Sequence, residues 1–314
     1  MTWLMFWTVS AVWSFLTGLM RIGVAVGLLQ PTRLDCRVIS VGNLQVGGAG
    51  KTPLVALIAR EAFQKTGKTV CILCRGYGSE WESQGGVIAP QGARPDVGEC
   101  GDEAALLHDL APNAYIGVGS DRVRQFEKVR ELAKAQGKDI QLVVLDDGFQ
   151  HWRIHKDLEI VAVTSSKRGE VLYRDWGPAI RYADLVVWTK GTFRPEFHDK
   201  PHCRVLYQLP KPSVENGIWL VSGVADGDFA RLTAEKAGYQ VSRHISFPDH
   251  ARYDEGMVHE IVEQALRVDC SVAVTGKDWV KWREFGIPHS KVIVLEPELH
   301  FEEGRETWDR MLWA

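Results

Sequence analysis

The stretch "SVGNLQVGGAGKTPL", residues 40–54, places four glycines and one lysine within a short span. It follows an apolar run typical of a strand and precedes an amphipathic helical pattern that starts near Pro53, a residue tolerated in the first turn of a helix. Glycines allow successive backbone N–H groups to converge on phosphate oxygens, and the helix N-terminus adds a positive dipole. The stretch therefore predicts a strand, a phosphate-binding loop and a helix.

This loop gives each of its residues an expected role. Lys51 is expected to reach the β- and γ-phosphates of ATP, and the Thr52 hydroxyl to ligate Mg²⁺. The strict pattern G-x-x-x-x-G-K-[ST] has glycine where this chain has Gln45. A glycine turn with a purely structural role is the alternative. The predicted nucleotide-binding residues are Gly47, Gly48, Ala49, Gly50, Lys51, Thr52 and Pro53.

Acidic residues elsewhere offer ligands for the metal ion of a nucleotide. In "QLVVLDDGFQH", residues 141–151, an apolar strand runs into Asp146 and Asp147. A carboxylate at the carboxyl end of a strand beside the loop can hold Mg²⁺ or its waters, and we do not choose between these two aspartates. A simple Asp-Gly turn is the alternative. Gln150 and His151 are candidates for orienting phosphates or substrate, with structural roles equally compatible.

Two further segments carry ionisable residues whose roles the spacing leaves open. "GECGDEAALLHDL", residues 98–110, places Asp102 and Glu103 at a predicted helix start, where acidic residues are also favoured as caps and dipole partners. "SFPDHARYDEG", residues 246–256, places His250 on a loop before another helix. A lone loop histidine is more often a surface residue than a catalytic base.

The order of elements predicts an α/β fold. Apolar runs such as "RVISVG", "TVCILCRG" and "EIVAVTS" alternate with helical patterns, which implies a mostly parallel P-loop-type sheet covered by helices on both faces. The turn-rich stretch 208–217 is the expected linker to a smaller second α/β unit. We therefore divide the chain into a hydrophobic N-terminal helix at 1–30, a nucleotide-binding domain at 31–207 and a small domain at 208–314.

The N-terminal segment has no charge before Arg21. Ser10, Ser14, Thr17 and Arg21 are spaced by four, three and four residues, so they share one stripe of a helix that is otherwise apolar and rich in tryptophan. This pattern predicts a helix lying in a membrane interface, with the stripe toward the protein body or the headgroups. A helix packed on the core and a transmembrane span are the alternatives.

The composition limits other classes of function. A net charge of −3 argues against a nucleic-acid-binding protein that relies on bulk positive charge. Cys71 and Cys74 form a C-x-x-C pattern within a predicted strand, where residues three apart face opposite sides. The six cysteines are therefore interpreted as apolar fillers in a reducing cytoplasm.

Several strings together resemble those of the tetraacyldisaccharide 4′-kinases, which phosphorylate the lipid A precursor. "SVGNLQVGGAGKTP", "RGYG", "GDEAALL", "GSDR", "DDGFQH", "FPDH" and "TGKD" occur in the family's order, and the apolar N-terminal helix also matches. The resemblance implies a P-loop kinase on the cytoplasmic face of the bacterial inner membrane, peripheral or monotopic. Such a kinase transfers the γ-phosphate of ATP to the 4′-hydroxyl of a tetraacylated glucosamine disaccharide 1-phosphate, and its partners are this lipid and the membrane surface.

The resemblance also implies roles for individual residues. Asp102 matches the family's catalytic acid and His250 its partner, so that Asp102 accepts the proton of the sugar hydroxyl. Glu103 then joins Thr52 around Mg²⁺, with Asp146 and Asp147 nearby. The resemblance also suggests Arg75, Arg122 and Arg124 as partners for the anionic groups of the lipid, joining Gln150 and His151 as substrate candidates.

The chain departs from the family pattern at three places. Ala104 stands where proline is common, Gly276 replaces a glutamate, and the stretch 171–184 keeps only Gly177-Pro178 of the usual motif. The stretch 171–184 bears on how substrate is held.

Two rival functions remain, a membrane-targeted P-loop ATPase that acts as a switch and a soluble small-molecule kinase. Val46 counts against the switch, because such proteins often carry lysine before the Gly-Gly pair.

Overall fold

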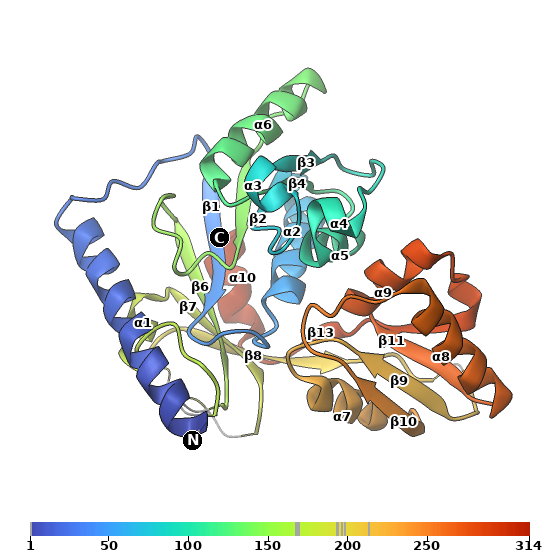
Figure 1. Cartoon of the computed structure of the whole chain (residues 1–314). Helices are drawn as coiled ribbons and strands as arrows, with labels where there is room; N and C mark the ends of the chain where they lie inside the picture. The colour runs from blue at the N-terminus through green and yellow to red at the C-terminus, as the bar shows by residue number, and fades with distance from the viewer. Residues whose placement is uncertain (1, 167–169, 193–194, 196, 198, 213) are drawn as a thin grey trace.

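The computed structural model describes residues 2–166, 170–192, 195, 197, 199–212 and 214–314, with the side chains described from residue 5 onward. A nine-stranded sheet forms the large unit and a four-stranded parallel sheet forms the small one (Figure 1). In the large sheet the strands lie in the order β13 (Glu298–Glu303), β8 (His202–Gln208), β7 (Leu185–Lys190), β6 (Leu158–Thr164), β1 (Arg37–Asn43), β5 (Leu142–Asp146), β2 (Val70–Cys74), β4 (Tyr115–Val118) and β3 (Gly86–Ile88). In the small sheet the order is β10 (Val241–Ser246), β9 (Ile218–Ser222), β11 (Ser271–Thr275) and β12 (Val292–Leu295).

Helices cover both sheets, as the apolar runs predict. In the described chain they are α1 (Thr2–Ala25), α2 (Lys51–Thr66), α3 (Trp81–Gln84), α4 (Val97–Cys100), α5 (Asp102–Leu110), α6 (Arg122–Ala135), α7 (Gly227–Ala237), α8 (Glu255–Arg267), α9 (Gly276–Trp282) and α10 (Arg305–Trp313). Short 3₁₀ helices lie at η1 (Gly177–Tyr182), η2 (Arg283–Phe285) and η3 (His289–Lys291).

The core of the large unit has two sides, one on each face of the sheet. Side chains of α2, α5 and α10 pack with one face of the central strands. Side chains of α6 pack with the other face. Cys74 lies in the first cluster and Cys71 in the second, and both are fully buried free thiols. The prediction that these two cysteines face opposite sides of a buried strand is confirmed.

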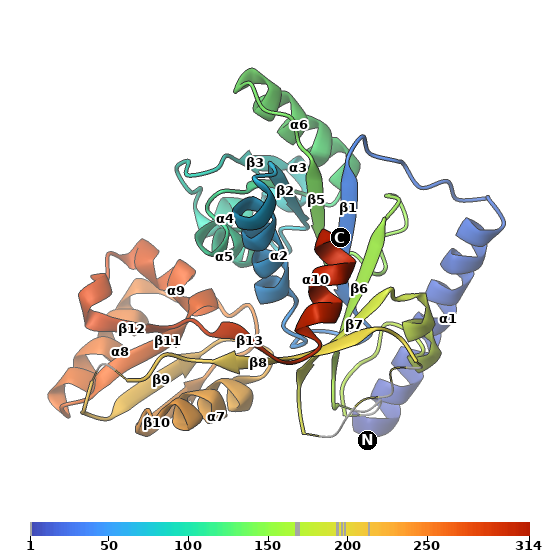
Figure 2. The same cartoon turned by 180° about the vertical axis from the view of Figure 1, so that it is seen from behind.

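The chain crosses between the two units twice. β13 pairs antiparallel with β8, so that Glu298 lies opposite Gln208 where the first crossing leaves the large sheet. α10 then packs on α2 and the sheet, as Figure 2 shows. The expected division at residue 208 assigns 298–314 to the small unit, whereas these residues return to the large sheet. Polar side chains in "ELHFEE" obscure the strand, because β13 is an exposed edge strand.

Helix α1 lies along the large unit on the side away from the small unit (Figure 1). Ser10, Ser14 and Thr17 are buried, and Arg21 forms an ion pair with Asp175. Apolar side chains such as Val12 and Phe15 are exposed. The stripe therefore faces the protein body, which settles the choice between body and headgroups. In the described chain α1 is the one helix long and apolar enough to cross a membrane.

Candidate active site

The glycine-rich loop connects the central strand β1 to helix α2. Gly47, Gly48 and Gly50 all have positive φ, at 69°, 64° and 69°, a conformation that glycine adopts without steric cost. A Cβ on Gly50 would lie 1.6 Å from the Tyr207 hydroxyl oxygen, so a larger residue fits this position only if the tyrosine moves. The Tyr207 hydroxyl donates to the Gly50 carbonyl at 3.0 Å, and the Thr189 hydroxyl donates to the Ala49 carbonyl at 3.0 Å. Strands β7 and β8 thus hold the loop's carbonyls.

Helix α2 begins at Lys51, two residues before the expected start. Thr52 and Pro53 lie in its first turn, where backbone N–H groups have no partner within the helix and proline is tolerated. The loop therefore presents a helix N-terminus with the residues of a phosphate site beside it. The backbone N–H groups of this first turn suit the close approach of a phosphate to backbone.

Lys51 is held by a polar cluster that consists of Asn43, Asp147 and Arg174. Its Nζ lies 3.3 Å from Asn43 Oδ1 and 3.3 Å from Asp147 Oδ1. Arg174 donates to both carboxylate oxygens of Asp147 at 2.7 Å and to Asn43 Oδ1 at 2.6 Å. Burial opposes ionisation of Asp147, but the charges of Lys51 and Arg174 outweigh it and hold its pKa well below the usual range. Asp147 is therefore an anion that orients two cations.

Asp146 has a different environment from Asp147. It ends β5, is buried, and its Oδ1 finds no hydrogen-bond partner in the described part of the chain. Burial raises the pKa of Asp146, and the negative charge of Glu103 raises it further. A cation near the carboxylates of Asp146 and Glu103 would offset the cost of ionising Asp146.

The donor set around Asp146 fits Mg²⁺ that is shared with phosphates. Among the described residues no group of three or more His, Cys, Asp or Glu side chains is arranged to hold a metal ion. Mg²⁺ in nucleotide sites takes one or two carboxylates and completes its octahedron with phosphate oxygens and water. Thr52, Glu103, Asp146 and Asp147 stay predicted ligands.

Asp102 and His250 meet across the two units. Asp102 opens α5 of the large unit, and His250 lies on the loop before α8 of the small unit. His250 Nδ1 is 3.0 Å from Asp102 Oδ2, and Asp102 is only 6% exposed. Lys277 and Lys281 place their Nζ atoms 3.8 Å and 3.7 Å from the same carboxylate oxygen.

The surroundings of the Asp102–His250 pair favour the charged form of both side chains. Burial opposes ionisation of Asp102, but the hydrogen bond from His250 and the charge of Lys277 lower its pKa below the usual value. The hydrogen bond to Asp102 raises the pKa of His250 against the effect of burial. Lys277 Nζ also lies 2.8 Å from Asp249 and 3.4 Å from His250 Nε2. The pair thus consists of a carboxylate whose ionised form is favoured and an adjacent imidazole whose protonated form is favoured.

Glu103 links this pair to the phosphate loop. It follows Asp102 in α5, and its charge perturbs the pKa of Asp146 on one side and of Lys277 on the other. Glu103 therefore lies within electrostatic range of both Asp146 and Lys277.

The predicted substrate residues have different surroundings in the structure. Arg75 is exposed and pairs with Glu82 at 2.7 Å. Gln150 Nε2 donates to the Asn43 carbonyl at 3.0 Å. Burial and the neighbouring Arg122, 3.3 Å from His151 Nδ1, lower the pKa of His151 to about 3, so His151 is neutral. Arg124 is exposed, whereas Arg122 is buried and donates to the Asp146 carbonyl at 3.0 Å.

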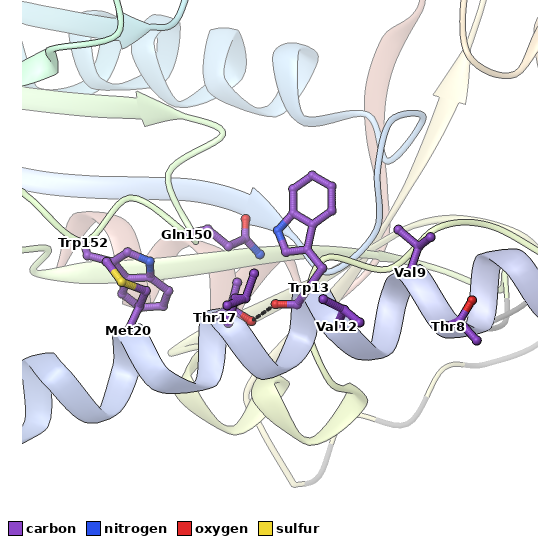
Figure 3. Close-up of a pocket in the computed structure, with 9 residues that line it drawn as sticks. Thr8, Val9, Val12, Trp13, Thr17, Met20, Gln150 and Trp152 are labelled. Atoms are coloured by element: carbon purple, nitrogen blue, oxygen red, sulfur yellow. Dashed lines mark hydrogen bonds between the residues drawn. The ribbon is translucent and has the colours of Figure 1, made fainter.

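Gln150 also borders a pocket against the N-terminal helix. The pocket measures 580 Å³ and lies between α1 and the loop that contains Gln150 and Trp152 (Figure 3). Its lining residues are Thr8, Val9, Val12, Trp13, Leu16, Thr17, Met20, Gln150 and Trp152. Gln150 therefore contacts Asn43 beside the phosphate loop and also lines a pocket against the apolar helix α1.

Comparison with known proteins places this arrangement in a family. The family model for LpxK, tetraacyldisaccharide-1-P 4′-kinase, matches residues 2–313. The chain belongs to the tetraacyldisaccharide 4′-kinase family. The relative from Geobacter sulfurreducens, named tetraacyldisaccharide 4′-kinase, is 33% identical over 296 residues, which cover 87% of this chain and 82% of the relative. The relative of the same name from Geobacter metallireducens is 32% identical, with 84% and 83% covered.

A solved structure of the family has the same fold. The crystal structure of "apo" form LpxK from Aquifex aeolicus in complex with ATP matches with a TM-score of 0.74 at 24% identity, covering 99% of this chain and 98% of that one. The expected α/β fold is thus shown for this member of the tetraacyldisaccharide 4′-kinase family, including the apolar N-terminal helix.

Sequence reasoning missed Asn43, Arg174, Lys277 and Lys281, which complete the site of this 4′-kinase family member. Asn43 lies within the opening stretch and ends β1, so its place beside the loop was a usable signal. Arg174 lies in the stretch 171–184 that departs from the family pattern. Lys277 lies in "TGKD", where α9 begins at Gly276. Their contacts depend on chain segments that are far apart in sequence.

Proposed function

We propose that this protein transfers the γ-phosphate of ATP to the 4′-hydroxyl of a tetraacylated glucosamine disaccharide 1-phosphate in lipid A biosynthesis. The match of the family model to residues 2–313 is the observation that carries this proposal. The glycine loop, the Lys51 cluster and the Asp102–His250 pair agree with it, because phosphoryl transfer needs a phosphate cradle, cations and a group that accepts the hydroxyl proton.

The proposed reaction assigns a separate task to each part of the site. The loop and Lys51 hold the phosphates in line with the acceptor, and Arg174 keeps Asp147 and Asn43 in place around Lys51. Thr52, Glu103, Asp146 and Asp147 would hold Mg²⁺, whose bound charge would neutralise that of the phosphates.

Asp102 is the proposed base. The sugar 4′-oxygen forms a bond to the γ-phosphorus, the bond from that phosphorus to the β–γ bridging oxygen breaks, and ADP leaves while the hydroxyl proton passes to the Asp102 carboxylate. A lowered pKa is compatible with this task, because phosphoryl-transfer transition states are loose and proton removal comes late. His250 orients Asp102 through its 3.0 Å contact. Because His250 belongs to the small unit, the base is fully positioned only when the two units meet.

Helix α1 is the proposed site of contact with the membrane surface, at the cytoplasmic face of the bacterial inner membrane. Its apolar side chains are exposed, while its polar stripe packs on the protein body. A helix docked along its length on a polar body fits a position in the interface better than a span across the bilayer. Val46 before the glycine pair and the family match do not favour the membrane-targeted ATPase switch.

The reaction is tested by measuring ADP formation from ATP and Mg²⁺ in detergent, with and without tetraacyldisaccharide 1-phosphate. We expect ADP formation to depend on the lipid, and to be absent with an analogue that lacks the 4′-hydroxyl. Equal ADP formation with and without lipid would instead support the ATPase switch.

A further inference from the structure

The polar stripe of α1 contacts three consecutive residues of the segment 173–175. Ser10 Oγ accepts a hydrogen bond from the Tyr173 backbone N–H at 2.8 Å. The Thr17 hydroxyl lies 3.2 Å from the Arg174 carbonyl, and Arg21 forms an ion pair with Asp175. The helix therefore holds the backbone on both sides of the Arg174 side chain.

Arg21 also contacts a second loop of the site. Its guanidinium carbon lies 4.6 Å from the centroid of the Phe149 ring, 5.0 Å from Trp152 and 4.5 Å from Tyr182. Phe149 and Trp152 flank Gln150 and His151, and only Gly148 separates Phe149 from Asp146 and Asp147. Arg21 is 11% exposed at its side chain and Asp175 is 2% exposed, so this ion pair is shielded from solvent. Figure 3 shows Trp152 and Gln150 beside α1.

Both loops end at the Lys51 cluster. From the segment 173–175, Arg174 reaches Asp147 and Asn43, which are the two partners of Lys51. From the other loop, Gln150 donates to the Asn43 carbonyl. A path thus runs from Arg21 through its ion pair with Asp175, along the backbone to the neighbouring Arg174, and from the Arg174 side chain to Asp147 and Lys51.

We propose that Arg21 is a positioning residue for phosphoryl transfer, which acts by fixing Arg174 and the 149–152 loop around Lys51. Helix α1 is then part of the catalytic fold as well as a contact with the membrane. The expected effect on kcat rests on the proposed kinase function. The expected effect on nucleotide affinity does not, because ATP binding can be measured without a lipid acceptor.

The test separates positioning from membrane attachment by working in detergent micelles with the full-length chain. We expect Arg21→Ala to lower kcat by about tenfold or more and to weaken binding of a fluorescent ATP analogue, because contacts in one network couple strongly. Arg21→Lys keeps the charge but not the planar stacking on the rings, and we expect a partial loss of both quantities. The control Phe15→Ser, at a side chain 60% exposed on α1, should weaken vesicle binding and leave nucleotide affinity unchanged.

A double-mutant cycle asks whether Arg21 acts through Arg174. In the Arg174→Ala background, Arg21→Ala should weaken binding of the ATP analogue little further. Additive losses of affinity would overturn the proposal, as would wild-type kcat and affinity for Arg21→Ala in detergent. If Arg21→Ala does not fold, the same double-mutant cycle is measured with Arg21→Lys in its place. Lack of lipid phosphorylation by the wild type would refute the proposed function, and the binding cycle would still test the positioning role.

Discussion

Replacing Gly50 by alanine tests the conformation of the phosphate loop, and Gly67 offers a matched control. Both residues cap α2, at its start and its end, and both have positive φ, 69° and 65°. Alanine in this left-handed region costs about 1–2 kcal/mol at either position. At Gly67 an added Cβ has no atom within 4 Å, so Gly67→Ala measures the cost of the dihedral angles alone.

At Gly50 the added Cβ meets a second cost. It would lie 1.6 Å from the Tyr207 hydroxyl oxygen and 2.7 Å from Cζ, so the tyrosine must move and lose its hydrogen bond to the Gly50 carbonyl. Overpacking and the lost hydrogen bond together add about 1.5–4.5 kcal/mol to the cost of the dihedral angles. We therefore expect Gly50→Ala to destabilise the protein by that much more than Gly67→Ala.

Urea unfolding of both variants measures this difference, and calorimetric titration with ATP measures its consequence for the site. Gly50→Ala should bind ATP more weakly, whereas Gly67→Ala should bind it as the wild type does. In a Tyr207→Ala background the gap in stability between the two glycine variants should close. Equal destabilisation of the two variants in the wild-type background, or unchanged ATP affinity of Gly50→Ala, would refute the reasoning.

Substitutions at three other residues probe the remaining parts of the site. Lys51→Ala should lower kcat by about 100- to 1,000-fold, as removal of one preorganised charge contact does, while thermal unfolding shows an intact fold; a loss below threefold would contradict its role. Asp102→Ala should depress phosphate transfer and leave ATP binding intact, and adding His250→Ala should cost little more, so additive losses in kcat would count against a pair acting as a unit. The pKa of His250 is raised above its ordinary value of 6.5 in the folded protein, so its contribution to stability is full below about pH 6.5 and is lost as pH rises through the raised pKa. The stability advantage of the wild type over His250→Gln should therefore be larger at about pH 5.5 than at about pH 9, and an equal advantage at both values would mean that the pair does not hold the charged imidazole.

Local patterns predicted the phosphate loop and the buried sheet well. Three glycines before Lys51 permit the positive φ angles that the loop adopts, and uniformly apolar strands imply burial on both faces. The four-three-four spacing of the α1 stripe likewise predicted a single polar face. These features depend on residues that are neighbours along the chain.

Features that depend on distant segments were not predictable in this way. Asp102 and His250 are 148 positions apart, and the residues alone left both roles open until the resemblance paired them. The position of Arg174 depends on how α1 seats the segment 173–175, which no local pattern encodes. The return of β13 to the large sheet was missed because an edge strand with alternating polar residues carries a weak signal.

The most direct measurement follows the terminal phosphate itself. Purified protein is incubated with Mg²⁺, γ-labelled ATP and tetraacyldisaccharide 1-phosphate in detergent, and the lipid product is isolated and its phosphate positions are determined. We expect the label on the 4′-oxygen of the disaccharide, in amounts equal to the ADP formed. Label that appears only as inorganic phosphate, while ADP accumulates, would contradict this expectation.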